Sequence, residues 1–387
     1  MISFNVFQEL FECEKPIIQG GMGPYDTTNL AIAVSKAGAI GLISTVGMGS
    51  FHMPGIGEFR YSAVFGEASP EELLTNCMDK VLKELADFPN ARFGINIPVS
   101  EEFIPTASRL IRTVLDRVKK DPEAKKKCRA IITSAGDPLP WAIEPSGTHI
   151  KDAVSIKKQC PGITWGHVVP SVRGAMRCEK AGVDVVIASG KEGGAHCSWR
   201  DPSSMVLVPE VAKRIKRPVV AAGGFCDGHS LVAALALGAI GIQMGTRFIA
   251  TRESDFEQGW KELLVTATEE DSVVARGFFG PMRFIRNTRA LDLVDATLRG
   301  APDLYKGIPT GSSLEILDLE VGGLDNLFKG DLEAAPILGG VVAGRIHNIP
   351  NVEELIDGIM QEAEAVMKRL QSDYNFSVSA GGSRQNP

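Results

Sequence analysis

The chain has 387 residues, of which 44% are hydrophobic and 23% are charged, and its formal net charge is −6. This mildly acidic balance argues against a nucleic-acid partner, and no apolar run reaches the roughly 18 residues that a membrane span needs. The length suits one barrel domain of about 250 residues with an additional piece.

The cysteines and the N-terminus favour the cytoplasm. The seven cysteines are an odd number without CxxC spacing, so neither a disulfide framework nor a zinc site is predicted. The opening MISFNVFQELFECEKP lacks the basic region that begins a signal peptide. We expect a cytoplasmic protein that acts on a small molecule, with no membrane and no metal; a homodimer stays open.

The first βαβ unit is predicted near the N-terminus. Residues 17–21 (IIQGG) form a short strand that ends in glycine, and residues 40–44 form the next strand. Between them, Thr27 or Thr28 is expected to cap a helix that runs to about Lys36. A right-handed crossover between parallel strands follows.

Residues 45–69 form a long connection of Gly, Pro and aromatic residues without strand or helix periodicity. Long irregular loops in compact domains are usually functional. We therefore expect a lid here. His52 is expected to be a surface residue, because no second histidine or carboxylate stands at metal-ligand spacing around it.

Strands and helices then alternate up to residue 181. Strands are predicted at residues 92–97, 129–134 and 163–169, and helices at residues 69–87, 101–120, 148–158 and 170–181. Asn96 stands in an otherwise apolar strand and needs hydrogen-bond partners. Its amide either bonds to a neighbouring loop or reaches a bound polar ring system.

The stretch from residue 184 to residue 252 carries the densest signal. Residues 185–188, 219–222 and 240–244 are apolar runs typical of strands buried on both faces, and each breaks into glycine at its carboxyl end. They bring the predicted parallel strands to eight, which closes a barrel. Asp227 is expected to cap a helix over residues 230–237, so Gly223 and Gly224 precede a helix N-terminus, a geometry that binds phosphate.

One histidine, His196, stands in the first of these glycine turns, residues 190–196. Glycines around a lone ionisable side chain suit a flat ligand that comes close while one group moves protons. A loop histidine bonded to the backbone is the structural alternative.

After Thr251 the pattern changes. Residues 252–334 look mainly helical, with Pro and Gly breaks and no strand runs of the earlier type. We predict that residues 252–334 form a cap on a barrel built from residues 1–251 and 335–375. Residues 352–370 are expected to form a last wall helix, and residues 376–387 a disordered tail.

Five motifs in order resemble the nitronate monooxygenase family (formerly 2-nitropropane dioxygenases) and its relative, the FMN-dependent enoyl-ACP reductase II. They are PIIQGGMG (16–23), FGIN (93–96), GKEGGAH (190–196), AAGGFCDG (221–228) and QMGTRF (243–248). The resemblance implies an α/β fold, a (β/α)8 TIM barrel that binds FMN and carries an inserted helical substrate domain.

The resemblance also implies site residues. His196 falls at the catalytic histidine. The residues implied to contact the flavin ring are Gly20, Gly21, Met22, Asn96 and Ser189. Those implied to hold the ribityl chain and phosphate are Gly194, Gly223, Gly224, Gln243, Met244, Gly245 and Thr246. Three positions depart from the family pattern: Ala195 replaces a glycine, Ser189 a common Gln or Glu, and Arg345 a frequent Gln. Arg345 either places a cation near the substrate or forms a salt bridge on the rim.

Two reactions fit this resemblance. In a nitronate monooxygenase, His196 acts as a base toward a substrate whose carbanion the nitro group stabilises, and FMN and then oxygen take the electrons. In an enoyl reductase, NAD(P)H reduces FMN, and hydride goes to the acyl β-carbon. We predict the monooxygenase; the reductase is the alternative, and a non-catalytic flavin-binding barrel is the minor one. Because no strand–GxGxxG–helix unit is present, FMN is expected rather than FAD or NAD.

Overall fold

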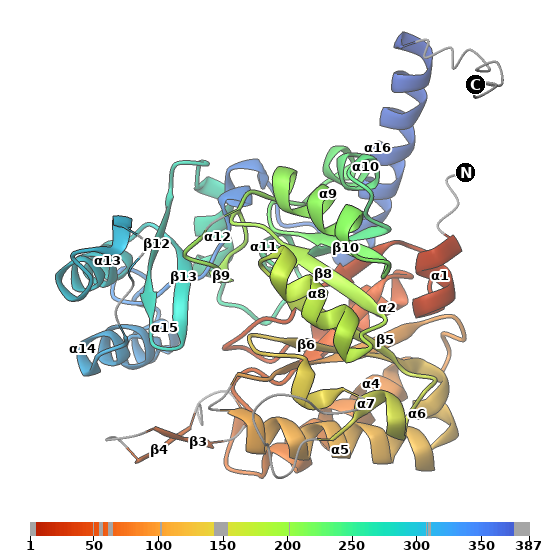
Figure 1. Cartoon of the computed structure of the whole chain (residues 1–387), viewed down its shortest axis with the longest axis horizontal. Coiled ribbons are helices and arrows are strands. Elements are labelled where there is room, and N and C mark those ends of the chain that lie inside the picture. The colour runs from red at the N-terminus through yellow and green to blue at the C-terminus, as the bar shows by residue number, and fades with distance from the viewer. Residues whose placement is uncertain are drawn as a thin grey trace, which may run out of the picture.

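A closed parallel barrel forms the centre of the protein (Figure 1). The computed structural model describes residues 5–48, 50–53, 57–60, 65–100, 103–142, 154–200, 202–306, 308 and 311–374. Within these residues, eight parallel strands close in the order β1, β2, β5, β6, β7, β8, β10, β11. They are β1 (Ile17–Gln19), β2 (Ile40–Ser44), β5 (Arg92–Pro98), β6 (Cys128–Ser134), β7 (Thr164–Val169), β8 (Val185–Ser189), β10 (Val219–Ala222) and β11 (Gly241–Met244). The predicted (β/α)8 barrel is confirmed.

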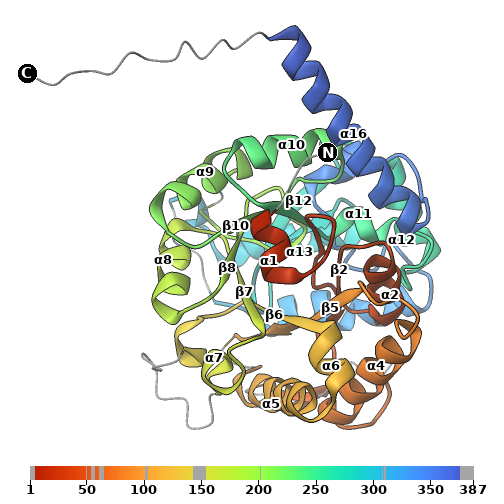
Figure 2. The same ribbon diagram turned by 90° about the vertical axis from the view of Figure 1, so that its right-hand side faces the viewer.

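A ring of helices covers the barrel wall, as the view down the barrel shows (Figure 2). Every residue of β1, β2, β10 and β11 is buried because side chains fill the barrel interior and helices cover its outside. The barrel helices are α2 (Thr28–Lys36), α4 (Pro70–Glu84), α5 (Ile104–Lys120), α6 (Pro122–Lys127), α7 (Ile156–Gln159), α8 (Val172–Ala181), α9 (Ser204–Arg214), α10 (Gly228–Ala236), α11 (Thr246–Ile249), α12 (Gln258–Thr266) and α16 (Val352–Asp373), and α1 (Asn5–Phe11) precedes β1.

Hydrogen bonds explain two helix starts, one as predicted and one not. Asp227 caps α10, where its Oδ1 accepts from the backbone N of Ser230 at 2.8 Å in a capping box. The prediction that Thr27 or Thr28 caps α2 is wrong. The Thr27 hydroxyl instead donates to the carbonyl of Leu42 (3.0 Å), and Asp26 accepts from the backbone N of Thr28 (2.9 Å).

The segment predicted to be an irregular lid contains a β-hairpin. Strands β3 (Ser50–Met53) and β4 (Gly57–Arg60) pair antiparallel. The turn between them lies outside the described residues, as does the side chain of His52. Residues 148–153 of the predicted helix 148–158 and the predicted tail, residues 376–387, also lie outside them. The role of a lid stays a prediction.

The segment predicted to be a helical cap also contains strands, and the expectation of none was wrong. Strands β12 (Ser272–Gly277) and β13 (Gly280–Ile285) form a hairpin that pairs with the short strand β9 (Ala195–His196). The sequence GFFG at residues 277–280 forms the hairpin turn, so its glycines are turn residues and not the helix breaks predicted for this segment. This sheet packs with α13 (Thr288–Gly300) and α14 (Leu314–Leu317), and together they form a lobe beside the barrel (Figure 1). The buried side chains of α15 (Leu324–Phe328), Leu324 and Leu327, belong instead to the core cluster of the barrel.

None of the described helices has a long enough apolar stretch to cross a lipid bilayer. The division into a barrel of residues 1–251 and 335–375 and a cap of residues 252–334 stays a prediction. One observation complicates the boundary: Trp260 of α12 is fully buried in the same core cluster as the barrel strands.

Candidate active site

A cavity of about 620 Å³ opens at the carboxyl ends of the barrel strands. This is the face that carries the catalytic residues in barrels of this type. All of the residues predicted from the sequence line the cavity. They are His196, Gly20, Gly21, Met22, Asn96, Ser189, Gly194, Gly223, Gly224, Gln243, Met244, Gly245 and Thr246.

The floor of the cavity is built by Gly21 against Asn96. A Cβ at Gly21 would stand 2.1 Å from Cγ of Asn96, so the chain after β1 can lie here only as glycine. The Asn96 amide is held inside the barrel: Nδ2 donates to the carbonyl of Ile132 (3.1 Å) and to the hydroxyl of Ser134 (3.2 Å). The internal hydrogen bonds of Asn96 thus go to the neighbouring strand β6 and not to a loop as predicted. Its Oδ1 accepts from the hydroxyl of Ser44 (3.4 Å) and retains capacity to accept a further donor.

The glycine turn that carries His196 is fixed by a carboxylate. The Glu192 side chain accepts from the backbone N of Ser204 (2.9 Å) and from its hydroxyl (2.9 Å), at the start of α9. A negative charge at a helix N-terminus is favourable. The Ser204 hydroxyl also lies 3.2 Å from the carbonyl of Ala222, so it links this turn to the turn after β10. Sequence reasoning did not single out Ser204.

A returning segment closes the same turn from the other side. A Cβ at Gly194 would stand 2.6 Å from the carbonyl carbon of Gly339 and 2.7 Å from the backbone N of Gly340. That backbone N donates to Oγ1 of Thr246 at 3.0 Å. Gly194, Gly340 and Thr246 therefore form one tight contact among backbones that are far apart in the sequence.

His196 lies on strand β9, with its Cα paired to that of Met282 on β13. The buried guanidinium of Arg283 donates through Nε to the carbonyl of Lys191 (3.0 Å) and also to the hydroxyl of Ser272 (3.0 Å). Because Arg283 joins the hairpin to the glycine turn, the cap fixes the strand of His196. The sequence did not reveal this link, because the hairpin itself was missed.

Ala195, beside the histidine, has a φ of +59°, a left-handed conformation that favours glycine. Its methyl group packs against the apolar cluster of the cap. At the position where the family has glycine, this turn therefore holds a side chain in a strained backbone conformation.

Gln243 gives the clearest sign that a ligand belongs in the cavity. Its side chain is buried at the end of β11, and Nε2 has no hydrogen-bond partner among the described residues. Buried donors are nearly always paired. A polar ligand that accepts from Nε2 would satisfy this atom, and the glycine floor leaves room for a flat one.

Two other ionisable side chains, His167 and Arg345, have hydrogen-bond or ion-pair partners within the protein. His167 is fully buried; Nδ1 lies 2.7 Å from the hydroxyl of Thr133 and Nε2 lies 3.1 Å from the carbonyl of Gly136. Burial lowers the pKa of His167 to about 4, so the ring is neutral and structural. Arg345 forms an ion pair with Asp227. Of the two roles considered for Arg345, a cation near the substrate or a salt bridge on the rim, the structure shows the salt bridge.

These features define a class of protein: a (β/α)8 barrel enzyme with a histidine and a glycine-lined cavity on its catalytic face. A sequence model described as nitronate monooxygenase matches residues 5–362. The chain belongs to the nitronate monooxygenase family. It is therefore an oxidoreductase of that type.

Individual relatives are distant. A probable nitronate monooxygenase of Staphylococcus aureus (strain JH9) is 25% identical over 327 residues, which cover 77% of this chain and 82% of the relative. The structure of FabK from Thermotoga maritima aligns with a TM-score of 0.72 and 28% identity over 96% of this chain and 100% of that chain. A nitroalkane oxidase from Streptomyces ansochromogenes aligns with a TM-score of 0.69 and 19% identity over 94% and 99%, which supports the fold alone.

Proposed function

We propose that this enzyme is an FMN-dependent nitronate monooxygenase that oxidises alkyl nitronates with oxygen and uses His196 as a base. The observation that carries the proposal is the cavity itself, which gathers His196 and the glycine turns on one face of the barrel, together with the Gln243 amide, whose Nε2 finds no partner in the described part of the chain. Family membership supports the same chemistry.

The residues present fit FMN. Gln243 would donate to the polar edge of the ring system, and Gly21 would let the ring lie against the floor at Asn96. Backbone N–H groups of the turns at Gly223 and Gly245 would hold the terminal phosphate. When bound, the flavin supplies a two-electron acceptor that oxygen can reoxidise.

His196 supplies the proton chemistry in this proposal. Its strand is fixed by the pairing of β9 with β13, and its side chain lines the cavity. An imidazole can take or return a proton near neutral pH. The role of the chain is then to orient the nitronate beside this imidazole and to exclude water with the cap.

The alternative function is an NAD(P)H-dependent enoyl thioester reductase. The observation that favours it is the alignment with FabK from Thermotoga maritima, which covers nearly the whole of both chains. The reductase differs from the monooxygenase in its electron donor. The two reactions can therefore be separated by testing which compound delivers electrons.

The cofactor prediction is tested by extraction. We expect the purified protein to be yellow and to release FMN, because the turns at Gly223 and Gly245 offer N–H groups for one terminal phosphate and no GxGxxG unit is present to hold a dinucleotide. Mass spectrometry of the heat-released chromophore identifies it. Release of FAD would refute the assignment to FMN, and a protein that stays colourless after incubation with FMN would refute flavin binding altogether.

The reaction is tested in the steady state by oxygen uptake. With propyl-1-nitronate as the sole added substrate, we expect oxygen consumption that needs no NADH or NADPH. Unreacted 1-nitropropane, kept in its neutral form, is the matched control for the nitronate anion. Oxygen uptake that appears only when a nicotinamide is added would contradict the proposal.

A further inference from the structure

The cap places one carboxyl group, that of Glu320, on the wall of the cavity. Glu320 is only 7% exposed. Its Oε2 accepts a hydrogen bond from the backbone N of Phe278 in the hairpin turn. No partner for Oε1 is found among the residues that the structure describes, so half of this buried carboxyl group is left without an internal donor.

The surroundings of Glu320 are apolar. It lies in a π-helical turn (Asp318–Gly322), a feature that often marks functional sites. On either side of it in the sequence, Leu317 and Val321 are buried against three phenylalanine rings, those of Phe103, Phe278 and Phe279. Within the described part of the chain, no Lys or Arg forms an ion pair with it. Burial accordingly raises the pKa of Glu320 to about 7.

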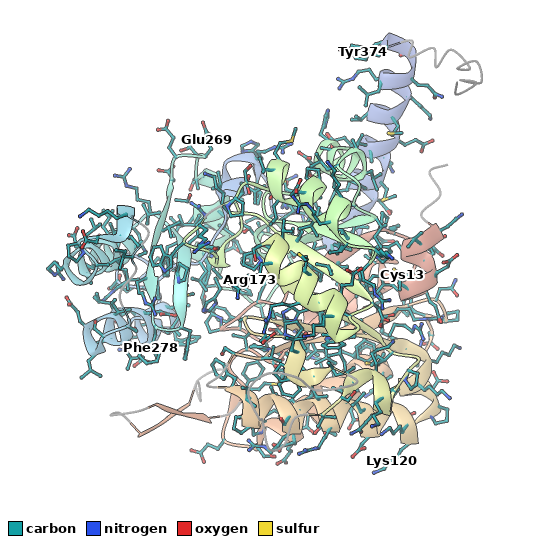
Figure 3. All side chains as sticks on the ribbon, in the orientation of Figure 1. Cys13, Lys120, Arg173, Glu269, Phe278 and Tyr374 are labelled. Atoms are coloured by element: carbon teal, nitrogen blue, oxygen red, sulfur yellow. The ribbon has the colours of Figure 1, made fainter. Side chains whose placement is uncertain are left out.

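Glu320 lies on the same wall of the cap as the strand of His196. The side chains of Glu320 and Met282 both lie against the backbone of Gly277. A Cβ placed on this glycine would stand 2.8 Å from Oε2 of Glu320 and 2.3 Å from the sulfur of Met282. Met282 is the residue paired with His196 across the sheet. Phe278, whose backbone N binds Glu320, marks the end of the hairpin in Figure 3. A ligand that reaches His196 thus has Glu320 within the same cavity.

We propose that Glu320 determines substrate specificity: its free oxygen accepts a hydrogen bond from a donor, above all an ammonium group, on the part of the substrate remote from the reactive carbon. An uncompensated buried carboxylate is costly, and a cationic donor supplies the missing partner. A substrate that carries a carboxylate at this position would instead face the negative charge of Glu320, which selects against it. This inference rests on the proposed function only in that the substrate occupies the cavity.

The decisive variant is Glu320→Gln. Glutamine retains an oxygen that can accept from the Phe278 backbone N, so the hairpin turn keeps its hydrogen bond. The free atom changes from an acceptor to a donor, and the charge is lost. A merely structural role for Glu320 would leave ligand preference unchanged, whereas the proposed role predicts that the preference is lost or reversed.

The probes are hexan-1-amine, hexan-1-ol and hexanoate, titrated into the purified protein by calorimetry at pH 8, where the amine is protonated and Glu320 is largely ionised. We expect the wild type to bind the amine at least about 10-fold more tightly than hexanoate. A charge-assisted hydrogen bond between the ammonium group and Glu320 is strong enough to give this difference in affinity. In Glu320→Gln the ratio should fall to about one or invert.

Asp318→Asn is the matched control, because it removes the same charge from an exposed position of the same turn. It should keep the wild-type ratio. The proposal is overturned if the wild type binds amine and acid equally, if it binds none of the three probes, or if Glu320→Gln keeps the wild-type ratio. The binding ratio needs no turnover, so it can be measured even if the nitronate reaction fails.

Discussion

Replacement of His196 by asparagine will lower turnover about 10²- to 10⁴-fold while the protein keeps its cofactor. Asparagine is polar and of similar size, and β9 pairs with β13 through backbone atoms, so the glycine turn should keep its shape. The proton-transfer group is what is lost. The measurement is kcat with propyl-1-nitronate, together with the amount of flavin bound per chain.

His229→Asn is the control for this variant. His229 is a second histidine, in the first turn of α10; it pairs with Glu362 (2.9 Å) and lies outside the cavity lining. Its replacement should leave kcat within about twofold, as for surface substitutions away from the site. A His196→Asn variant that turns over like the wild type would assign a structural role to His196.

Substitution of Gly194 by alanine will weaken cofactor binding about 100-fold. The added Cβ would stand 2.6 Å from the carbonyl carbon of Gly339 and 2.7 Å from the backbone N of Gly340. Backbone atoms cannot rotate away, so either the turn or residues 339–340 must move. Overpacking of this kind costs about 1–3 kcal/mol, of which the upper end corresponds to about 100-fold in affinity.

Gly193→Ala is the matched control in the same turn. There the nearest atoms to the new Cβ are 3.4 Å away, which is ordinary contact. Flavin titration of the apoprotein, followed by fluorescence quenching, gives the two dissociation constants. Equal affinities for the two variants would show that the contact of Gly194 with residues 339–340 does not shape the cofactor site.

The barrel could be predicted from the sequence because its signals are local. Each parallel strand is a short, largely apolar run, and β1, β8, β10 and β11 are followed directly by glycine. The helix after β10 is capped by a nearby residue, Asp227. The cofactor turns follow from the same pattern, since strand ends meet on one face of any parallel barrel. That is why every predicted site residue lies in one cavity.

The cap could not be predicted in the same way. In the sequence, the turn between β12 and β13 appears as two glycines that flank Phe278 and Phe279. This pattern does not distinguish a hairpin turn from a break between helices. Arg283 reaches Lys191 over 92 positions of sequence, and Glu320 reaches Phe278 over 42. Such contacts leave no periodic signal, so the residues that the cap adds to the site emerge only from the structure.

The strained position before the histidine was visible in the sequence as a departure, but its conformation was not. Ala195 could have stood in an extended strand, where a methyl group costs nothing. In the structure it has a φ of +59° and packs on the cap. The substitution is therefore coupled to the cap that covers it, which a motif comparison does not reveal.

The source of the electrons tests the central claim most directly. The purified protein is mixed without oxygen, in separate experiments, with propyl-1-nitronate, NADH and NADPH, and its visible absorbance is followed. If the enzyme is a nitronate monooxygenase, the yellow colour bleaches with the nitronate and persists with both nicotinamides, because the substrate itself carries the electrons. Rapid bleaching by NADH or NADPH, with none by the nitronate, would contradict the account and establish the reductase alternative.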